Sequence, residues 1–184
     1  MNPNISLQCA RVALGAALCS ASLCFAQPSP ANYKDLSDVL AIGIPLFAAG
    51  VSYARDDTPG LLQLGKSELA TLAATEGLKR ALPKDRPNGR DNQSFPSGHT
   101  SVSFAAAQYL QTREGWKYGA PAYALATIVG YSRVQAQEHY WTDVLAGAAL
   151  GMASGYYFTD PKQPVQVGLS RLGSTTFVQV STAW

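Results

Sequence analysis

The chain has 184 residues, the length of one ordinary domain, and carries 14 Lys and Arg against 12 Asp and Glu. This near-neutral balance gives no support for nucleic-acid binding, which needs a concentration of basic residues to match the phosphate charge. Three cysteines, Cys9, Cys19 and Cys24, lie within the first 26 residues, so neither a disulfide framework nor thiol chemistry is expected in the remainder.

The chain begins with a segment typical of a secretory signal. Arg11 is the only charge in the first 33 residues, and the apolar run 12–26 that follows it ends before a Pro-rich stretch. The run has 15 residues, fewer than the ~20 that a spanning helix needs. We expect residues 1–26 to be a signal peptide, cleaved after Ala26, and the mature protein to be exported to a bacterial periplasm. An uncleaved anchor is the alternative.

Residues 27–37 are expected to form a short N-terminal arm. Helices are predicted over 39–54, 60–82, 99–112, 118–132 and 140–158, with a loop rich in charge and turn formers over 83–98.

The runs 39–54, 118–132 and 144–158 carry no charge and have 15 or 16 residues each. We interpret them as buried helices of a compact bundle, with short membrane helices as the alternative. In the last run Gly147, Gly151 and Gly155 permit close helix contact in either setting.

The C-terminal tail, residues 161–184, changes character. Apolar and polar residues alternate on both sides of Gly173 and Ser174, which predicts a β-hairpin with a turn at this pair. We expect the hairpin to pack on the bundle or to pair at an edge.

A histidine and an aspartate stand four residues apart in the stretch SRVQAQEHYWTD. This spacing places His139 and Asp143 on one face of a helix, where an imidazole and a carboxylate can meet. An aspartate bonded to one ring nitrogen fixes the tautomer and leaves the other nitrogen free as a base or nucleophile. A surface ion pair explains the same spacing, so this pattern alone decides nothing.

The stretch QSFPSGHT places turn-forming residues and a histidine at the start of a predicted helix. Unpaired backbone amides and the helix dipole at such a start favour a phosphate or another oxyanion. Gly98 lets a ligand approach the backbone closely, Ser97 adds a hydroxyl donor, and His99 lies on the first turn. A serine N-cap followed by an unrelated histidine is the other explanation.

Two basic residues precede this stretch: Lys79, near the end of a predicted helix, and Arg86, in the following loop. Alone they indicate no more than a solvated basic edge. The three patterns occur in order, however, as K-x6-RP, PSGH and SR-x5-H-x3-D, and in this combination the chain resembles the type 2 phosphatidic acid phosphatase and vanadium haloperoxidase superfamily. Every fixed position of that three-part signature is matched between Lys79 and Asp143.

The expected fold is therefore all-α. It is a compact helical bundle of the phosphatidic acid phosphatase and haloperoxidase type over residues 27–160, followed by the short C-terminal β-hairpin. The N-terminal segment and the tail lie outside the resemblance.

The resemblance implies a role for each matching residue. His139 would be the nucleophile that forms a phosphohistidine, Asp143 would orient it, and His99 would serve as general acid and then as base. The phosphate-binding groups would be Lys79, Arg86, Ser97, Gly98 and Arg133. Phosphoryl transfer depends mainly on positioning and charge stabilisation, which three cations can supply, so we expect neither a metal nor another cofactor.

The predicted function is a metal-independent phosphatase acting on a phosphomonoester or pyrophosphate, with a lipid phosphate met at a membrane surface favoured as substrate. A soluble periplasmic acid phosphatase of broad specificity is the alternative. Vanadate-dependent halide oxidation and a non-catalytic binding domain are weaker ones. The sequence indicates neither an oligomeric state nor which phosphate ester is hydrolysed.

Overall fold

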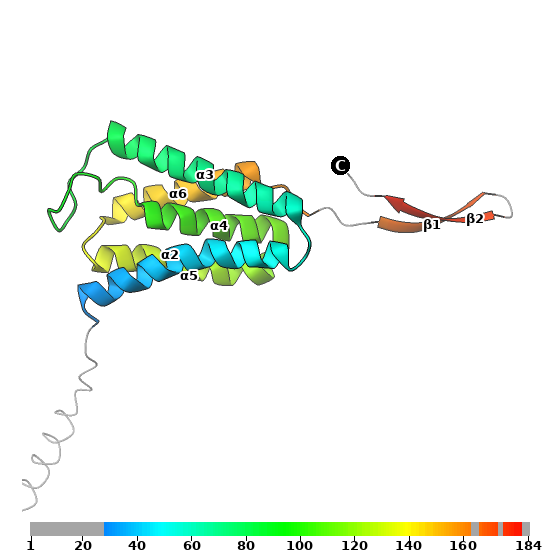
Figure 1. Ribbon diagram of the computed structural model, residues 1–184, viewed down its shortest axis with the longest axis horizontal. Coiled ribbons are helices and arrows are strands. Elements are labelled where there is room, and N and C mark those ends of the chain that lie inside the picture. Colours follow the sequence, from blue (N-terminus) through cyan, green and yellow to red (C-terminus); the bar gives the residue numbers. More distant parts are fainter. Residues whose placement is uncertain (1–27, 163–165, 173–174, 182–184) are drawn as a thin grey trace, which may run out of the picture.

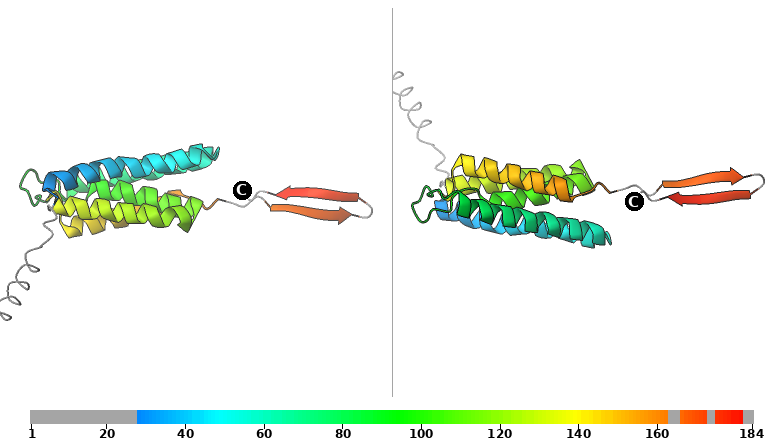
Figure 2. Two further views of the ribbon diagram at one scale, coloured as in Figure 1. Left: turned by 90° about the horizontal axis from the view of Figure 1, so that it is seen from below. Right: turned by 90° about the horizontal axis from the view of Figure 1, so that it is seen from above.

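The computed structural model describes residues 28–162, 166–172 and 175–181, and the predicted signal peptide lies outside them. In the described part five helices form the bundle: α2 (Pro30–Tyr53), α3 (Thr58–Ala81), α4 (Gly98–Glu114), α5 (Trp116–Gln135) and α6 (Trp141–Phe158). The helices run along a common direction, as Figure 2 shows. The predicted all-α bundle is confirmed.

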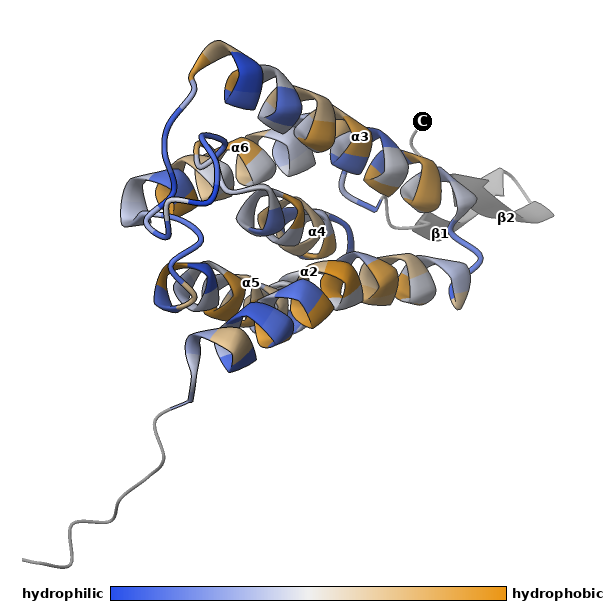
Figure 3. Cartoon of the chain, turned by 60° about the vertical axis from the view of Figure 1, so that its left-hand side comes forward, coloured by the Kyte–Doolittle hydropathy of each residue, from blue (hydrophilic) through white to orange (hydrophobic). Residues whose placement is uncertain are grey.

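Helix α4 is the central helix of the bundle. It packs against each of the other four helices, most extensively against α5 and α6, and Figure 1 shows it between α3 on one side and α2 and α5 on the other. Both α4 and α6 begin at the end of the bundle where the long loop 82–97 lies. This hydrophilic loop is blue in Figure 3. The N-terminal ends of two helices therefore converge beside it.

The N-terminal arm predicted over residues 27–37 is wrong, because α2 begins at Pro30. The Ser29 side chain accepts a hydrogen bond from the backbone amide of Asn32 at 3.3 Å, and Pro30 occupies the first helical position, where its missing amide costs nothing. The first turns of α2 are polar, so a prediction based on the apolar run 39–54 placed the start of the helix too late. The earlier start places Asp38 inside a helix.

Three glycines on α6 allow it to lie directly against α4. A Cβ atom at Gly151 would overlap the carbonyl oxygen of Ser101, and one at Gly155 would lie 2.6 Å from Cβ of Gln108. Such distances are far inside van der Waals contact, so only glycine permits this approach. The predicted close helix contact is confirmed, and it fixes the starts of α4 and α6 relative to each other.

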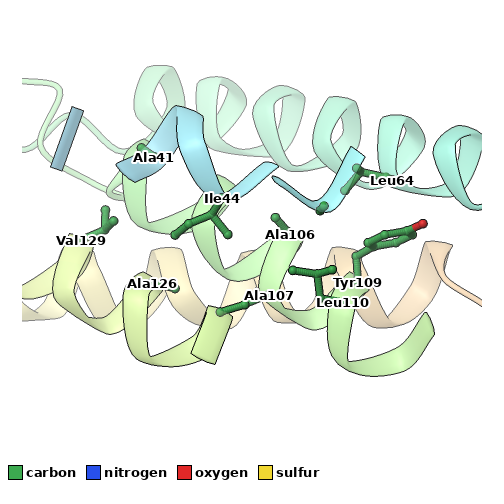
Figure 4. Close-up of a cluster of buried hydrophobic side chains, with 11 residues drawn as sticks. Ala41, Ile44, Leu64, Ala106, Ala107, Tyr109, Leu110, Ala126 and Val129 are labelled. Carbon is green, nitrogen blue, oxygen red and sulfur yellow. The ribbon is translucent and has the colours of Figure 1, made fainter. Parts of the chain in front are cut away.

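The buried core consists mainly of small side chains (Figure 4). Ala106, Ala107 and Ala126 are fully buried, and the large side chains among them are few, with Tyr109 and Leu110 the largest. The hydroxyl of Tyr109 lies 2.6 Å from Oγ of Ser52, which satisfies a polar group in the interior. Small core residues bring the helix axes close together.

The three charge-free runs are buried on one face only, which corrects the expectation that they are core helices. On α2, Val39 is 68% exposed and Ile42 is 65% exposed. Among the described helices, α2 alone has the length and apolar composition that crossing a membrane requires, with 28% of its apolar window buried. The outward faces of α5 and α6 carry further exposed apolar residues: Leu125, Ile128, Leu145 and Met152.

Beyond α6, strands β1 (Gln166–Leu172) and β2 (Thr175–Ser181) pair antiparallel, with Val167 opposite Val180. The predicted turn at 173–174 lies outside the described residues. Among the residues that are described, neither strand packs on a helix, unlike the expected packing on the bundle. A lone pair of strands is marginally stable, so the hairpin stays a prediction.

Candidate active site

A pocket of about 370 Å³ opens at the end of the bundle where α3 leads into the loop 82–97. Six of the predicted site residues line it: Lys79, Arg86, Gly98, His99, Arg133 and His139. They come from α3, the loop, α4, α5 and the segment between α5 and α6. Two further predicted residues, Ser97 and Asp143, are fully buried and do not line the pocket. The fold thus brings together residues that are up to 60 positions apart in sequence.

His139 lies in the segment between α5 and α6, and its side chain is 2% exposed. Its Nδ1 atom is 2.7 Å from the backbone carbonyl oxygen of Ser94. Because a carbonyl can only accept, Nδ1 carries the proton and Nε2 has a free lone pair. Burial, and then the positive charges of Arg133 and Arg86, lower the pKa of His139 to about 3. The imidazole is therefore neutral at ordinary pH, as a nucleophile must be.

Asp143 does not lie on a helical face with His139, and this part of the prediction is wrong. The N-cap residue of α6 is Tyr140, with an extended backbone, so His139 precedes the helix while Asp143 lies in its first turn. The Nδ1 atom of His139 is 3.9 Å from Oδ2 of Asp143, beyond hydrogen-bond distance.

The fully buried Asp143 carboxylate instead ties the loop 82–97 to α6. It accepts hydrogen bonds from Lys84 Nζ at 2.6 Å, from Ser94 Oγ at 2.5 Å and from the backbone amide of Tyr140 at 3.0 Å. The ammonium of Lys84 also lies 4.6 Å from the Tyr140 ring centre. Sequence reasoning missed Lys84 and Ser94 because neither is a fixed position of the three-part signature.

His99 lies on the first turn of α4, as predicted, with its Nε2 atom 3.0 Å from Oδ1 of Asp38 on α2. Burial and the neighbouring Arg133 lower the pKa of His99 to about 4, while Asp38 acts in the opposite direction. Nothing in the signature pointed to Asp38, which is 41 residues before Lys79.

Each of the three predicted cations has a hydrogen-bond partner within the protein, and for Arg86 and Arg133 that partner is a carboxylate. Lys79 Nζ donates to the carbonyl oxygen of Gln93 at 2.6 Å, and burial lowers the pKa of Lys79. Arg86 Nε donates to Asp91 at 2.6 Å. Arg133 Nη1 donates to Asp38 at 2.9 Å, whereas its Nε is buried with no hydrogen-bond partner among residues 28–162. A buried donor of this kind is a place where a ligand oxygen can bind.

Glu138 joins the basic residues of the site, and sequence reasoning missed it. Its side chain is 4% exposed and its Oε2 accepts from Arg86 Nη1 at 2.8 Å and from Arg90 Nη2 at 2.9 Å, with Arg133 Nη2 at 3.5 Å. A single buried carboxylate thus holds three guanidinium groups close together. It occupies the position before His139, one of the variable positions of the signature.

Ser97 and Gly98, at the start of α4, differ in their relation to the pocket. Gly98 lines the pocket, and a Cβ atom there would meet only Cγ2 of Thr75, at 3.6 Å, which is ordinary contact. The hydroxyl of Ser97 is buried and lies 2.9 Å from Oγ1 of Thr100, so it faces the helix and not the pocket. The backbone amide of Ser97 donates to the carbonyl oxygen of Asp143 at 3.0 Å.

Residues 28–162 contain no group of three or more His, Cys, Asp or Glu side chains placed to hold a metal ion. Basic side chains and the start of α4 supply positive charge at the site.

Residues 60–162, more than half of the chain, match the sequence profile of the PAP2 superfamily. A lipid A 4'-phosphatase of Helicobacter pylori is 34% identical over 142 residues, which cover 71% of this chain and 71% of that protein. A lipid A 1-phosphatase of the same species is 30% identical over 135 residues, covering 68% and 67% of the two chains.

Two crystal structures share the fold. Aquifex aeolicus LpxE matches with a TM-score of 0.61 at 21% identity, over 70% of this chain and 84% of that one. A transmembrane PAP2-type phosphatidylglycerolphosphate phosphatase from Bacillus subtilis matches with a TM-score of 0.56 at 23% identity, over 86% and 94%. The chain belongs to the PAP2 superfamily and is an enzyme of its phosphatase type, a phosphoric monoester hydrolase.

Proposed function

We propose that the protein hydrolyses a phosphomonoester or pyrophosphate of a lipid through a phosphohistidine at His139, without a metal. The observation that carries this proposal is the state of His139, a buried neutral imidazole whose proton is held on Nδ1 by the Ser94 carbonyl. Its Nε2 lone pair is then available in a pocket that also contains Lys79, Arg86 and Arg133. A neutral nucleophile beside fixed cations suits attack on a phosphate dianion.

In the first step Nε2 of His139 attacks phosphorus, a P–N bond forms and the P–O bond to the leaving group breaks. The leaving oxygen takes a proton from the imidazolium of His99, which lines the same pocket. The negative charge on the three non-bridging oxygens is balanced by the guanidinium and ammonium groups and by the start of α4.

In the second step the now neutral His99 accepts a proton from water, whose oxygen attacks phosphorus as the P–N bond breaks. Inorganic phosphate leaves, His139 is again neutral, and His99 again holds the proton. Protons balance over the cycle, so these two steps need no metal-bound hydroxide.

A lipid substrate is supported by the rest of the pocket lining. Ala41 and Ile42 on α2, Leu72 on α3 and Val102 on α4 form an apolar wall beside the basic residues. A lipid phosphate has a charged headgroup and an apolar tail, which suit the basic residues and the apolar wall of this pocket, respectively. The H. pylori relatives are named for activity on lipid A, and other similar proteins are named lipid phosphate phosphatases. These names favour a lipid over the broad small-molecule substrates of a soluble acid phosphatase.

The exposed apolar residues of the bundle support association with a membrane. Exposed large apolar residues are most numerous on α2 and α6, and α3 and α5 carry a few more. Exposed apolar residues in such number mark a surface that contacts lipid or another protein. Since the proposed substrate is a lipid, we propose lipid as the contact.

The deciding experiment is phosphate release by the purified full chain from lipid A, phosphatidic acid, a lipid pyrophosphate and soluble phosphomonoesters, each with and without a chelator. We expect turnover of at least one lipid phosphate that exceeds turnover of every soluble ester, inhibition by vanadate and no loss in the chelator. Turnover of soluble esters alone would contradict the lipid proposal. Loss of activity in chelator that returns with metal would contradict the metal-free mechanism. Flotation with lipid vesicles tests the membrane contact separately.

A further inference from the structure

Asp38 makes a contact that the three-part signature does not include. It lies on α2, outside residues 60–162, and its Oδ1 atom is 3.0 Å from Nε2 of His99 and 2.9 Å from Nη1 of Arg133. One carboxylate oxygen thus lies between the proposed acid and a proposed phosphate-binding cation. Its other oxygen, Oδ2, accepts from Lys34 Nζ at 2.6 Å, which holds the carboxylate in place from its own helix.

The charged groups around His99 come from several elements. Lys34 and Asp38 face it from α2, Arg133 faces it from α5, and Glu138 faces it from the segment after α5. Glu76 and Lys79 on α3 line the same pocket. Burial and the cations oppose protonation of His99, and Asp38 is the nearest group that favours it. A general acid in this setting needs such a carboxylate, because it must hold a proton before it can donate one.

We propose that Asp38 is a positioning residue that links His99 to Arg133 and keeps His99 easier to protonate than its cationic surroundings would allow. This inference rests on the proposed function only for its effect on turnover; the coupling between the two side chains is independent of the reaction. It also assigns α2, which lies outside the matched family region, a part in the chemistry.

The coupling can be measured without any substrate. The chain contains two histidines, so labelled histidine gives two imidazole signals by NMR, which a His139→Gln variant assigns. We expect Asp38→Asn to lower the pKa of His99 by about one unit and to leave that of His139 nearly unchanged. An unchanged or raised pKa of His99 in Asp38→Asn would overturn the proposal, whether or not the protein releases phosphate.

Turnover then tests the consequence. Because the acid must be protonated, a lower pKa moves the basic limb of the kcat/KM profile to lower pH by about one unit, a loss of about tenfold at a pH above it. Asp38→Glu keeps the negative charge, so we expect the basic limb of its kcat/KM profile to lie at the wild-type pH. The matched control is Asp35→Asn, which removes the same charge one turn earlier from an exposed residue with no ion pair within residues 28–162.

Three outcomes distinguish the possible failures. If wild-type protein releases no phosphate from any substrate, the proposed function fails while the NMR result still decides the coupling. If Asp38→Asn changes only the inhibition constant of inorganic phosphate and not the limb, Asp38 is a competitor for the phosphate site and the positioning role is wrong. If Asp35→Asn moves the limb equally, the effect is one of general charge and the proposal is also wrong.

Discussion

His139 donates its Nδ1 proton to the backbone carbonyl oxygen of Ser94 at 2.7 Å. A backbone acceptor fixes the tautomer of the imidazole regardless of the side chain at position 94. The carboxylate of Asp143, 3.9 Å away, therefore acts on His139 through the loop it anchors. The orientation of the proposed nucleophile depends on the position of the loop 82–97, and hence on what holds that loop in place.

Replacing His139 by Gln is expected to abolish turnover, with kcat falling at least about a thousandfold, because the side chain that would form the P–N bond is lost. Brief reaction of wild-type protein with labelled substrate, followed by alkaline quenching, should trap a phosphohistidine that mass spectrometry places at residue 139. His99→Gln should slow the release of a poor leaving group more than that of a good one. A labelled residue elsewhere, or full activity in His139→Gln, would show that the nucleophile is misassigned.

Replacing Lys84 by Met is expected to weaken both the fold and the reaction. The fully buried Asp143 would lose its cation, a loss we place at about 2 kcal/mol because Lys84 is itself partly exposed. The loop that carries Ser94 would shift, so kcat should fall about tenfold. Thermal melting and turnover check both effects. Lys66→Met, an exposed lysine on α3, is the control. Equal melting temperatures for the two variants would argue against this role of the ion pair.

The stability of the protein should fall on acidification, with a contribution from His139. Its pKa is about 3 in the folded protein and 6.5 ordinarily, so between these values the unfolded chain binds the additional proton. Stability from this group is complete above pH 6.5 and is lost as the pH falls toward 3, at up to about 1.4 kcal/mol per pH unit. Urea unfolding at a series of pH values gives the free energy of unfolding at each pH. We expect this free energy to depend less steeply on pH in His139→Gln than in wild-type protein. Identical slopes would mean that His139 titrates normally.

The contact between α4 and α6 should not tolerate even one methyl group. Gly151→Ala would force Cβ into the backbone of α4 at Ser101, and we expect a loss of about 3 kcal/mol together with reduced activity. The matched substitution Gly65→Ala lies on an exposed part of α3 with nothing within 4 Å of the new Cβ. It should raise stability by about 0.5–1 kcal/mol, since alanine restricts the unfolded chain. Denaturant unfolding distinguishes the two, and similar values would contradict the close contact.

The sequence predicted the helices and most of the pocket because both depend on local patterns. Apolar periodicity located α3 and α5 to within a few residues, and the signature identified six pocket-lining residues. The start of α2 was missed since its first turns are polar. The relation of His139 to Asp143 was missed since the spacing alone did not reveal that α6 begins between them.

What the sequence could not predict are contacts made across the bundle. Asp38 reaches His99 over 61 positions, and Lys84 reaches Asp143 over 59. Acidic and basic residues are common on any surface, so no pattern marks these as partners before the helices are packed together. The fixed positions of the signature include the proposed reacting groups, whereas Asp38 lies before the signature and Lys84 at one of its variable positions.

The carboxylate of Glu138, bound by Arg86 and Arg90 and near Arg133, has a consequence for how this site can be dissected. Guanidinium groups that share one acceptor cannot rearrange independently, so removing one changes how the other two are held. The effects of substitutions at these positions will therefore not sum, and double-mutant cycles among them will give large coupling energies. If these arginines bind the phosphate as proposed, its affinity will be a property of the cluster as a unit and not a sum over single arginines.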